Sequence, residues 1–222
     1  MTDKKRKIVG GGRTKFKKQV SESSKRYLMR QAKDPYVRKA AKMGYRSRAV
    51  FKLEEINDKY KIIKPGHTVV DLGAAPGSWA QLLTKMVGKK GQVIALDKIW
   101  MPPLEGVDII KGDFNEQEVY DQLVALCPDG VDVVVSDMAP ETSGHAGQDH
   151  LASMGLCELA EDFAYNMLKQ GGSFACKIFQ GGEEVDMRAR LRERFTKADF
   201  FKPESSRKES REMFLVATGF KG

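Results

Sequence analysis

The stretch Val69-Val70-Asp71-Leu72-Gly73-Ala74-Ala75-Pro76-Gly77-Ser78-Trp79 decides the fold class of this chain. Its pattern predicts a short buried strand, a tight turn of small residues and a helix that starts at Ser78. Such a turn lets the backbone approach a ligand closely, and the free N–H groups of the helix start favour an anionic group. Asp71, at the end of the strand, adds a fixed acceptor. We therefore expect a nucleotide-type cofactor site at the first strand of an α/β sheet.

The rest of the chain alternates between apolar strands and helical segments. Strands are predicted at 68–72, 92–97, 107–111, 131–136, 173–179, 198–202 and 212–219, and helices at 78–87, 115–126, 150–169 and 184–195 after a helical region that begins near Pro35. The 150–169 helix is expected to stop at Gly171-Gly172. This order predicts a Rossmann-like α/β fold with a doubly wound, mostly parallel seven-stranded sheet. The last two strands should pair antiparallel as a hairpin at the sheet edge.

Charge is distributed very unevenly along the chain. Residues 1–52 contain 18 Lys/Arg and 3 Asp/Glu, a net of +15, whereas residues 53–222 contain 20 and 27, a net of −7. We interpret 1–34 as a basic, flexible arm and 35–222 as the folded domain. Because the basic run continues into the folded part, with Tyr36 and Tyr45 interleaved, it favours a nucleic acid partner over a merely solubilising tail.

Several classes of protein are disfavoured by composition. No apolar run is long enough to span a bilayer, and the N-terminus lacks a secretory signal, so a cytoplasmic location and no membrane partner are expected. The cysteines and histidines are too scattered for a disulfide framework or a metal cluster, so no metal is predicted; they are Cys127, Cys157, Cys176, His67, His145 and His150. Nothing in the pattern demands more than a monomer.

The glycine spacing indicates which cofactor the first loop binds. The dinucleotide fingerprint G-x-G-x-x-G and the P-loop are both absent. What remains, from Asp71 through Gly73 to Gly77, is the D-x-G-x-x-x-G form typical of S-adenosylmethionine (SAM) sites. Asp97 ends the second strand, where it can accept both hydroxyls of a ribose, and Asp113 follows the third, where it can receive an adenine amino group. The sequence therefore predicts SAM.

The loop after the fourth strand narrows the methylation chemistry. It reads Ser136-Asp137-Met138-Ala139-Pro140 and has no aromatic residue to stack on a flipped base and no cysteine nucleophile. These absences argue against methylation of a base amino group and against carbon-5 methylation of a pyrimidine.

Five collinear motifs resemble those of the FtsJ/RrmJ family. They are Ser47-Arg48-Ala49-Val50-Phe51-Lys52-Leu53, Asp71 to Trp79, Ser136 to Pro140, Lys177-Ile178-Phe179-Gln180-Gly181 and Ser210-Arg211-Glu212. The resemblance runs from about residue 35 to the C-terminus and implies a SAM-dependent ribose 2′-O-methyltransferase of a uridine in 23S ribosomal RNA. Ser78 departs from the glycine common in bacterial members, and we expect its hydroxyl to cap the following helix.

The resemblance also implies site residues. It places a Lys-Asp-Lys-Glu tetrad at Lys52, Asp137, Lys177 and Glu212. A neutral lysine can remove the proton of a 2′-hydroxyl, and Lys177 is the expected general base, favoured in its neutral form by Lys52 and the cofactor's sulfonium. Asp137 and Glu212 should hold the lysines in line. The expected cofactor-binding residues are Asp71, Gly73, Gly77, Trp79, Asp97, Asp113 and Asp137.

Ribosomal RNA, in the large subunit or its precursor, is the expected partner. Phosphate contacts are predicted from basic residues of the N-terminal segment and of the 203–211 region, namely Lys39, Lys42, Arg46, Arg48, Arg207, Lys208 and Arg211. Three alternatives stay open: the same chemistry on transfer RNA or an mRNA cap, an RNA-binding ribosome assembly factor, and a small-molecule O-methyltransferase. The tetrad disfavours the assembly factor, and the basic arm disfavours the small-molecule enzyme.

Overall fold

The computed structural model describes residues 34–141 and 143–222, so the predicted basic arm lies almost entirely outside the described residues. The compact unit is Pro35–Gly222. Its helices are α2 (Pro35–Lys42), α3 (Val50–Tyr60), α4 (Ser78–Val87), the short 3-10 helix η1 (Gly88–Lys90), α5 (Gln117–Leu126), α6 (Ala146–Met167) and α7 (Glu184–Arg194). Its strands are β1 (Thr68–Leu72), β2 (Gln92–Asp97), β3 (Asp108–Lys111), β4 (Val131–Ser136), β5 (Leu168–Phe179), β6 (Phe195–Phe201) and β7 (Glu212–Phe220).

All seven strands form one sheet in the order β3-β2-β1-β4-β5-β7-β6. Strands β1 to β5 are parallel to one another, and β7 is antiparallel to both β5 and β6. The predicted fold class and the terminal antiparallel hairpin are therefore confirmed. Strand β7 inserts between β5 and β6, which brings its first residue beside the end of β5, where Phe179 pairs with Glu212.

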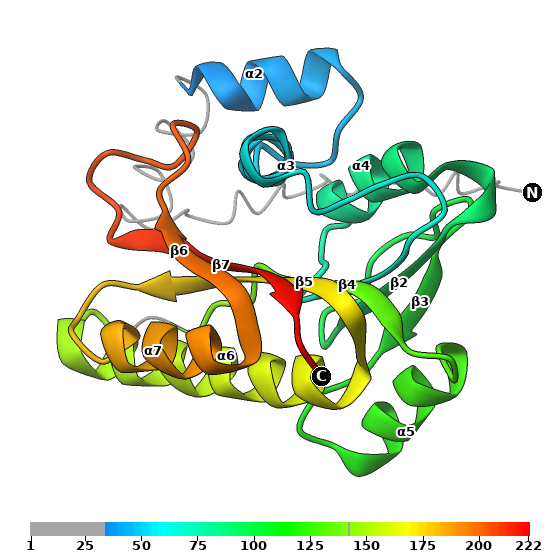
Figure 1. Ribbon diagram of the computed structural model, residues 1–222. Coiled ribbons are helices and arrows are strands. Elements are labelled where there is room, and N and C mark those ends of the chain that lie inside the picture. Colours follow the sequence, from blue (N-terminus) through cyan, green and yellow to red (C-terminus); the bar gives the residue numbers. More distant parts are fainter. Residues whose placement is uncertain (1–33, 142) are drawn as a thin grey trace, which may run out of the picture. The chain divides into compact units, whose positions relative to one another are not determined.

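Helices cover both faces of the sheet (Figure 1): α2, α3 and α4 lie on one side, and α5, α6 and α7 on the other. Two apolar clusters result, one containing Phe51 and Phe214 and the other Phe163 and Phe174, all at most 2% exposed. Burying one such ring contributes about 1.5–3 kcal/mol. Because both faces are covered, the central strands are continuously apolar rather than alternating.

Helix α6 and strand β5 correct two sequence predictions. The helix begins at Ala146 rather than 150, because the Asp149 carboxylate accepts hydrogen bonds from the N–H (2.7 Å) and hydroxyl (2.9 Å) of Ser143 and so fixes the entry into its first turn. It ends at Met167, and β5 already begins at Leu168, which pairs with Val131 before the register shifts. The two glycines at 171 and 172 therefore lie inside an irregular strand and do not stop the helix.

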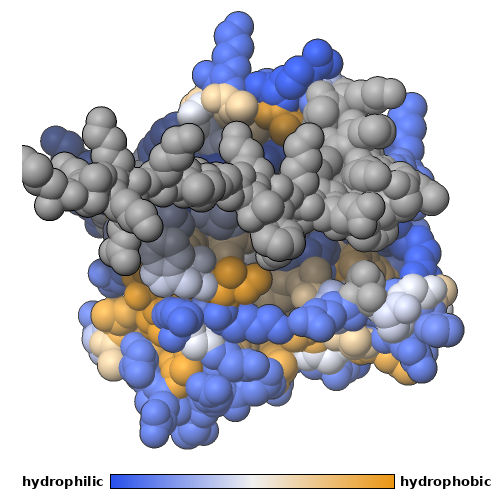
Figure 2. Space-filling model, turned by 180° about the vertical axis from the view of Figure 1, so that it is seen from behind, coloured by the Kyte–Doolittle hydropathy of each residue, from blue (hydrophilic) through white to orange (hydrophobic). Residues whose placement is uncertain are grey.

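On the face seen from behind, apolar surface is exposed in patches between hydrophilic side chains (Figure 2). Within residues 34–141 and 143–222, no helix combines the length and apolar character that crossing a bilayer requires.

Candidate active site

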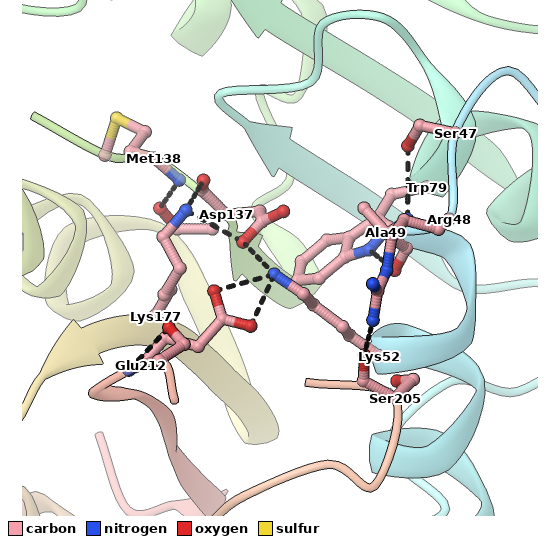
Figure 3. A network of polar contacts seen from close by, with 12 residues as sticks. Ser47, Arg48, Ala49, Lys52, Trp79, Asp137, Met138, Lys177, Ser205 and Glu212 are labelled. Carbon is pink, nitrogen blue, oxygen red and sulfur yellow. Dashed lines mark hydrogen bonds and ion pairs between the residues drawn. The ribbon is translucent and has the colours of Figure 1, made fainter. Parts of the chain in front are cut away.

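Four charged side chains meet at the carboxyl edge of the sheet, on the face covered by α3 (Figure 3). Lys177 Nζ lies 3.0 Å from Asp137 Oδ1. Lys52 Nζ lies 3.8 Å from the same oxygen and 2.9 Å from Glu212 Oε1. The structure thus joins the four residues of the expected tetrad into one network of ion pairs.

Strand alternation explains why these side chains share a face. Ala175 packs in the apolar cluster beneath α3, and Lys177 follows two residues later in the same strand, so it points to the same side. Lys177 pairs with Phe214 of β7, whose side chain belongs to that cluster too. Glu212 precedes Phe214 by two residues and therefore meets the site from the antiparallel strand.

The carboxylates and lysines of the network change one another's pKa. Burial lowers the pKa of Lys52, but the Asp137 and Glu212 carboxylates outweigh burial and raise it above its ordinary value. Burial raises the pKa of Asp137, but Lys177 and then Lys52 outweigh it and hold that pKa below its ordinary value. Lys177 Nζ also donates a hydrogen bond to the backbone carbonyl of Asp137. Asp137 therefore stays ionised, and its carboxylate and its backbone carbonyl hold Nζ of Lys177 from two directions.

Helix α3 is anchored so that Lys52 reaches Glu212. Arg48 donates to the Ser205 carbonyl, and Glu55 Oε1 accepts from the Ser205 N–H at 3.0 Å, which ties α3 to the β6–β7 loop. The indole of Trp79 donates to the Ala49 carbonyl at 2.7 Å and is only 2% exposed. The Trp79 side chain thus supports α3 and does not line the neighbouring cavity, so any part in cofactor binding falls to its backbone.

A cavity of about 440 Å³ opens beside the tetrad. Asp137, Gly73, Asp97 and Asp113 line it, together with apolar side chains that the sequence reading did not assign, namely Ile99, Phe114, Met138, Leu156 and Leu159. Pockets for small ligands have a volume of about 300–1,000 Å³ and a mostly apolar lining with a few polar groups. The volume and lining of this cavity therefore suit a nucleoside-sized ligand. Ile99 lies two residues after Asp97, the last residue of β2, and Phe114 directly follows Asp113 in the loop after β3, so closeness to these acidic residues could have identified both.

Asp97, which lines this cavity, is held by hydrogen bonds from two loops. Its Oδ2 accepts from the Ala75 N–H at 2.8 Å and its Oδ1 from the Ile99 N–H at 2.7 Å. One carboxylate thus joins the loop after β1 to the loop after β2, and its remaining lone pairs can accept further hydroxyl groups.

Asp113 stands after β3 in a similar role. Its Oδ1 accepts from the N–H (3.0 Å) and the side-chain amide (2.8 Å) of Asn115, and these bonds hold the pKa of Asp113 below its ordinary value. Its second oxygen has no hydrogen-bond partner among the described residues and can accept from an amino group.

Gly73 and Gly77 are required by contacts within the protein. A Cβ on Gly73 would lie 2.9 Å from the backbone Cα of Met138, and one on Gly77 would lie 2.8 Å from Nη1 of Arg46. Both have φ values, +76° and +97°, that favour glycine. The loop therefore packs tightly against the β4 end and against Arg46.

Two expectations for the first loop are wrong. Asp71 is the fourth residue of β1, not its end, and its fully buried carboxyl does not line the cavity. Burial, followed by Asp137 and Asp97, raises the pKa of Asp71 well above its ordinary value. Ser78 does not cap α4, because Gly77 occupies the cap position and the Ser78 hydroxyl instead bonds Ser47 Oγ at 2.8 Å.

The predicted RNA contacts fall into two groups. Lys39, Lys42, Lys208 and Arg211 are exposed. Arg46 instead donates to the carbonyls of Pro76 (2.9 Å), Pro102 (2.9 Å) and Pro103 (3.0 Å), and Arg48 is turned toward Ser205. Arg207 is half-buried. The Arg46 guanidinium is therefore engaged in holding two loops of the cavity together, a role that sequence reasoning missed.

The chain belongs to the FtsJ-like methyltransferase family, whose model matches residues 45–220. It is thus a methyltransferase, and the family implies a methyl donor of the SAM type.

Relatives agree with this family. The chain is 51% identical over 203 residues to the ribosomal RNA large subunit methyltransferase E of Marinobacter nauticus, covering 90% of this chain and 98% of that one. It is 48% identical over 199 residues to the protein of the same name in Gluconobacter oxydans, covering 90% and 74%. A ribosomal RNA methyltransferase structure from Plasmodium falciparum matches with a TM-score of 0.73 at 30% identity, covering 80% of this chain and 100% of that one.

Proposed function

We propose that this protein transfers a methyl group from SAM to the 2′-hydroxyl of a ribose, on a uridine, in 23S ribosomal RNA of the large subunit. The names of the relatives support a ribosomal RNA substrate. The observation that carries the proposed chemistry is the 3.0 Å contact of Lys177 with Asp137, a residue that lines the 440 Å³ cavity. A buried lysine beside a ligand cavity suits the deprotonation of a weakly acidic hydroxyl.

The cavity fits the proposed cofactor. Asp97 would bind the ribose hydroxyls and Asp113 the adenine amino group, while the backbone at Gly73, Gly77 and Trp79 would bind the anionic group of the cofactor near the start of α4. Asp71 is buried beneath the loop and would affect cofactor binding only through the loop, without touching the cofactor. When bound, SAM supplies an electrophilic methyl group and a positive charge.

The four residues of the tetrad have different roles in the proposed reaction. Neutral Lys177 accepts the proton of the 2′-hydroxyl at Nζ, which makes the ribose oxygen a stronger nucleophile. Lys52 stays charged, because Asp137 and Glu212 raise its pKa. Asp137 orients Lys177, and Glu212 orients Lys52. Positioning of this kind, with no covalent intermediate on the protein and no metal ion, accounts for the proposed catalysis.

The remaining proposals concern the setting of the reaction. Exposed Lys39, Lys42, Lys208 and Arg211 would contact RNA phosphates, and the segment 1–34 would act as a basic arm beside the domain 35–222. We further propose that the protein works as a cytoplasmic monomer on the large subunit or its precursor.

The test is transfer of labelled methyl groups from SAM to large-subunit particles that lack the modification. Nuclease digestion and mass spectrometry then locate the label on the ribose of a uridine. Lys177→Ala should still bind S-adenosylhomocysteine but lose roughly 10²–10⁴-fold in kcat, the usual contribution of a general base. Label on a base, label found only on transfer RNA or cap RNA, or full activity of Lys177→Ala would each contradict the proposal.

A further inference from the structure

The loop between β2 and β3 displays an unusual aromatic side chain. Trp100 is 65% exposed and its neighbour Ile99 is 61% exposed, which makes Trp100 the most exposed large hydrophobic side chain of the described residues. Exposed apolar side chains that adjoin one another form a contiguous patch, the kind of surface that marks binding sites when it is large enough.

The loop that carries Trp100 is firmly anchored. Met101, the next residue, is only 4% exposed, and the two carbonyls that follow, of Pro102 and Pro103, both accept from the Arg46 guanidinium. On the other side of Trp100, the Ile99 N–H is bonded to Asp97 at 2.7 Å. Since both flanks are fixed, the indole is presented to solvent by an ordered segment, and a ligand would bind it with little loss of backbone entropy.

A second cavity, of about 340 Å³, lies against this side chain. Trp100, Met101, Pro103, Val107 and Ile109 give it apolar walls, and Lys111 lies at its border. It shares Asp97 and Ile99 with the larger cavity but extends toward the edge strand β3. A flat aromatic ring carrying a nearby negative charge matches these walls and this lysine.

The place of the cavity relative to the tetrad suggests which ring this is. Both lie at the carboxyl edge of the sheet, and β2 stands three strands from β5, a separation of about 14 Å at the usual strand spacing. Arg46 lies in the connection between α2 and α3, and its guanidinium binds the loop that carries Trp100. The exposed lysines of α2 come just before this connection in the chain. A polyanion crossing that basic segment would therefore pass the indole.

We propose that Trp100 and this cavity bind a nucleobase of the RNA substrate, stacked on the indole, beside the nucleotide that is methylated. This inference rests on the proposed function and adds a subsite to it. Stacking on an aromatic side chain tolerates any base, so the subsite contributes affinity and positioning rather than sequence choice.

Tryptophan fluorescence of the full chain tests the contact directly. The sequence has two tryptophans, and Trp79 is buried, so acrylamide quenches chiefly Trp100. With saturating S-adenosylhomocysteine, Trp100 should stay accessible to acrylamide; a 12-nucleotide single-stranded RNA should then quench its emission and protect it. Absence of any RNA effect, or complete protection by S-adenosylhomocysteine alone, which would mean that the indole covers the cofactor, overturns the proposal.

Kinetics with unmodified large-subunit RNA provide the second arm. Trp100→Ala should raise the KM for RNA about tenfold, within the range of one stacked base, and leave the KM for SAM and the thermal midpoint unchanged. Trp100→Phe should stay near the wild type. The control is Val185→Ala, which removes a 50% exposed apolar side chain on α7. An unaltered KM for RNA in Trp100→Ala refutes the subsite, whereas inactivity of the wild type both on this RNA and on large-subunit particles that lack the modification refutes the proposed function instead.

Discussion

Lys52 and Glu212 meet across 160 positions of sequence, with Lys52 Nζ 2.9 Å from both carboxylate oxygens of Glu212. The contact joins α3 to the first residue of β7 and holds up the pKa of Lys52 against burial. Glu212→Gln keeps the shape and removes the charge, so the pKa of Lys52 should fall. If charged Lys52 is needed for catalysis, the alkaline limb of the kcat–pH profile should move to lower pH in the variant. Methyl transfer measured from pH 7 to 10.5 checks this, and an alkaline limb at the same pH as in the wild type would contradict it.

Arg46 offers a second prediction, because its guanidinium bridges the two loops that frame the 440 Å³ cavity proposed to hold the cofactor. Arg46→Ala removes hydrogen bonds to Pro76, Pro102 and Pro103 and should weaken S-adenosylhomocysteine binding about tenfold in calorimetric titration. Lys42→Ala, an exposed change in the same segment, serves as the control and should leave cofactor binding intact. Unchanged cofactor affinity in Arg46→Ala, with weaker RNA binding, would return Arg46 to the role of an RNA contact.

The buried carboxyl of Asp71 predicts a dependence of stability on pH. Among residues 34–141 and 143–222, neither of its oxygens has a hydrogen-bond partner of regular geometry, although the Ala80 N–H offsets part of the rise in pKa that burial causes. Since the folded pKa is raised, the stability that the protonated form contributes is complete below the unfolded pKa of about 3.9 and is lost as pH rises through the folded value.

Asp71→Asn removes this loss. The free energy of unfolding of this variant, relative to that of the wild type, should increase as pH rises. The increase should be about 1.4 kcal/mol for each pH unit between the unfolded and the folded pKa of Asp71. Urea unfolding at pH 5, 6, 7 and 8 measures the difference, and Asp129→Asn provides an exposed control. A stability difference that is the same at all four pH values would rule out this account of Asp71.

Salt should separate RNA binding from cofactor binding. The affinity for RNA should fall steeply as KCl rises, whereas the affinity for S-adenosylhomocysteine should change little. Lys42→Ala should reduce the log–log salt slope of RNA binding by about 1. Lys89→Ala, at an exposed position just before β2 and thus at the opposite edge of the sheet, should not change it. Equal slopes for the two variants would show that Lys42 makes no phosphate contact.

Local patterns were enough to predict most of the sheet. The runs 92–97 and 131–136 are apolar, short and bounded by turn residues, and they coincide with β2 and β4. The prediction failed at 168–172, where pairing of Leu168 with Val131 extends β5 through two glycines. Partner strands override local signals there, because each added pair satisfies backbone groups that a loop would leave to water.

The candidate site shows the same division. Motif resemblance could name Lys52, Asp137, Lys177 and Glu212, since each stands in a recognisable local run. It could not show that Trp79 binds the start of α3, that Asp71 is fully buried, or that Arg46 holds a loop that lines the cavity. These roles depend on contacts between residues 30 or more positions apart, which leave no periodic trace in the chain.

By itself, the sequence determined the order of strands and helices, the parallel sheet and the glycine loop after β1, because these follow from apolar periodicity and from turn residues that act over a few positions. Only the tertiary structure decided the insertion of β7, which carries Glu212 to Lys52, and the anchoring that leaves Trp100 in solvent. The physical reason is that ion pairs and buried contacts stabilise the protein only when their partners are close in space. Residues that are far apart in the sequence come close only once the chain has folded.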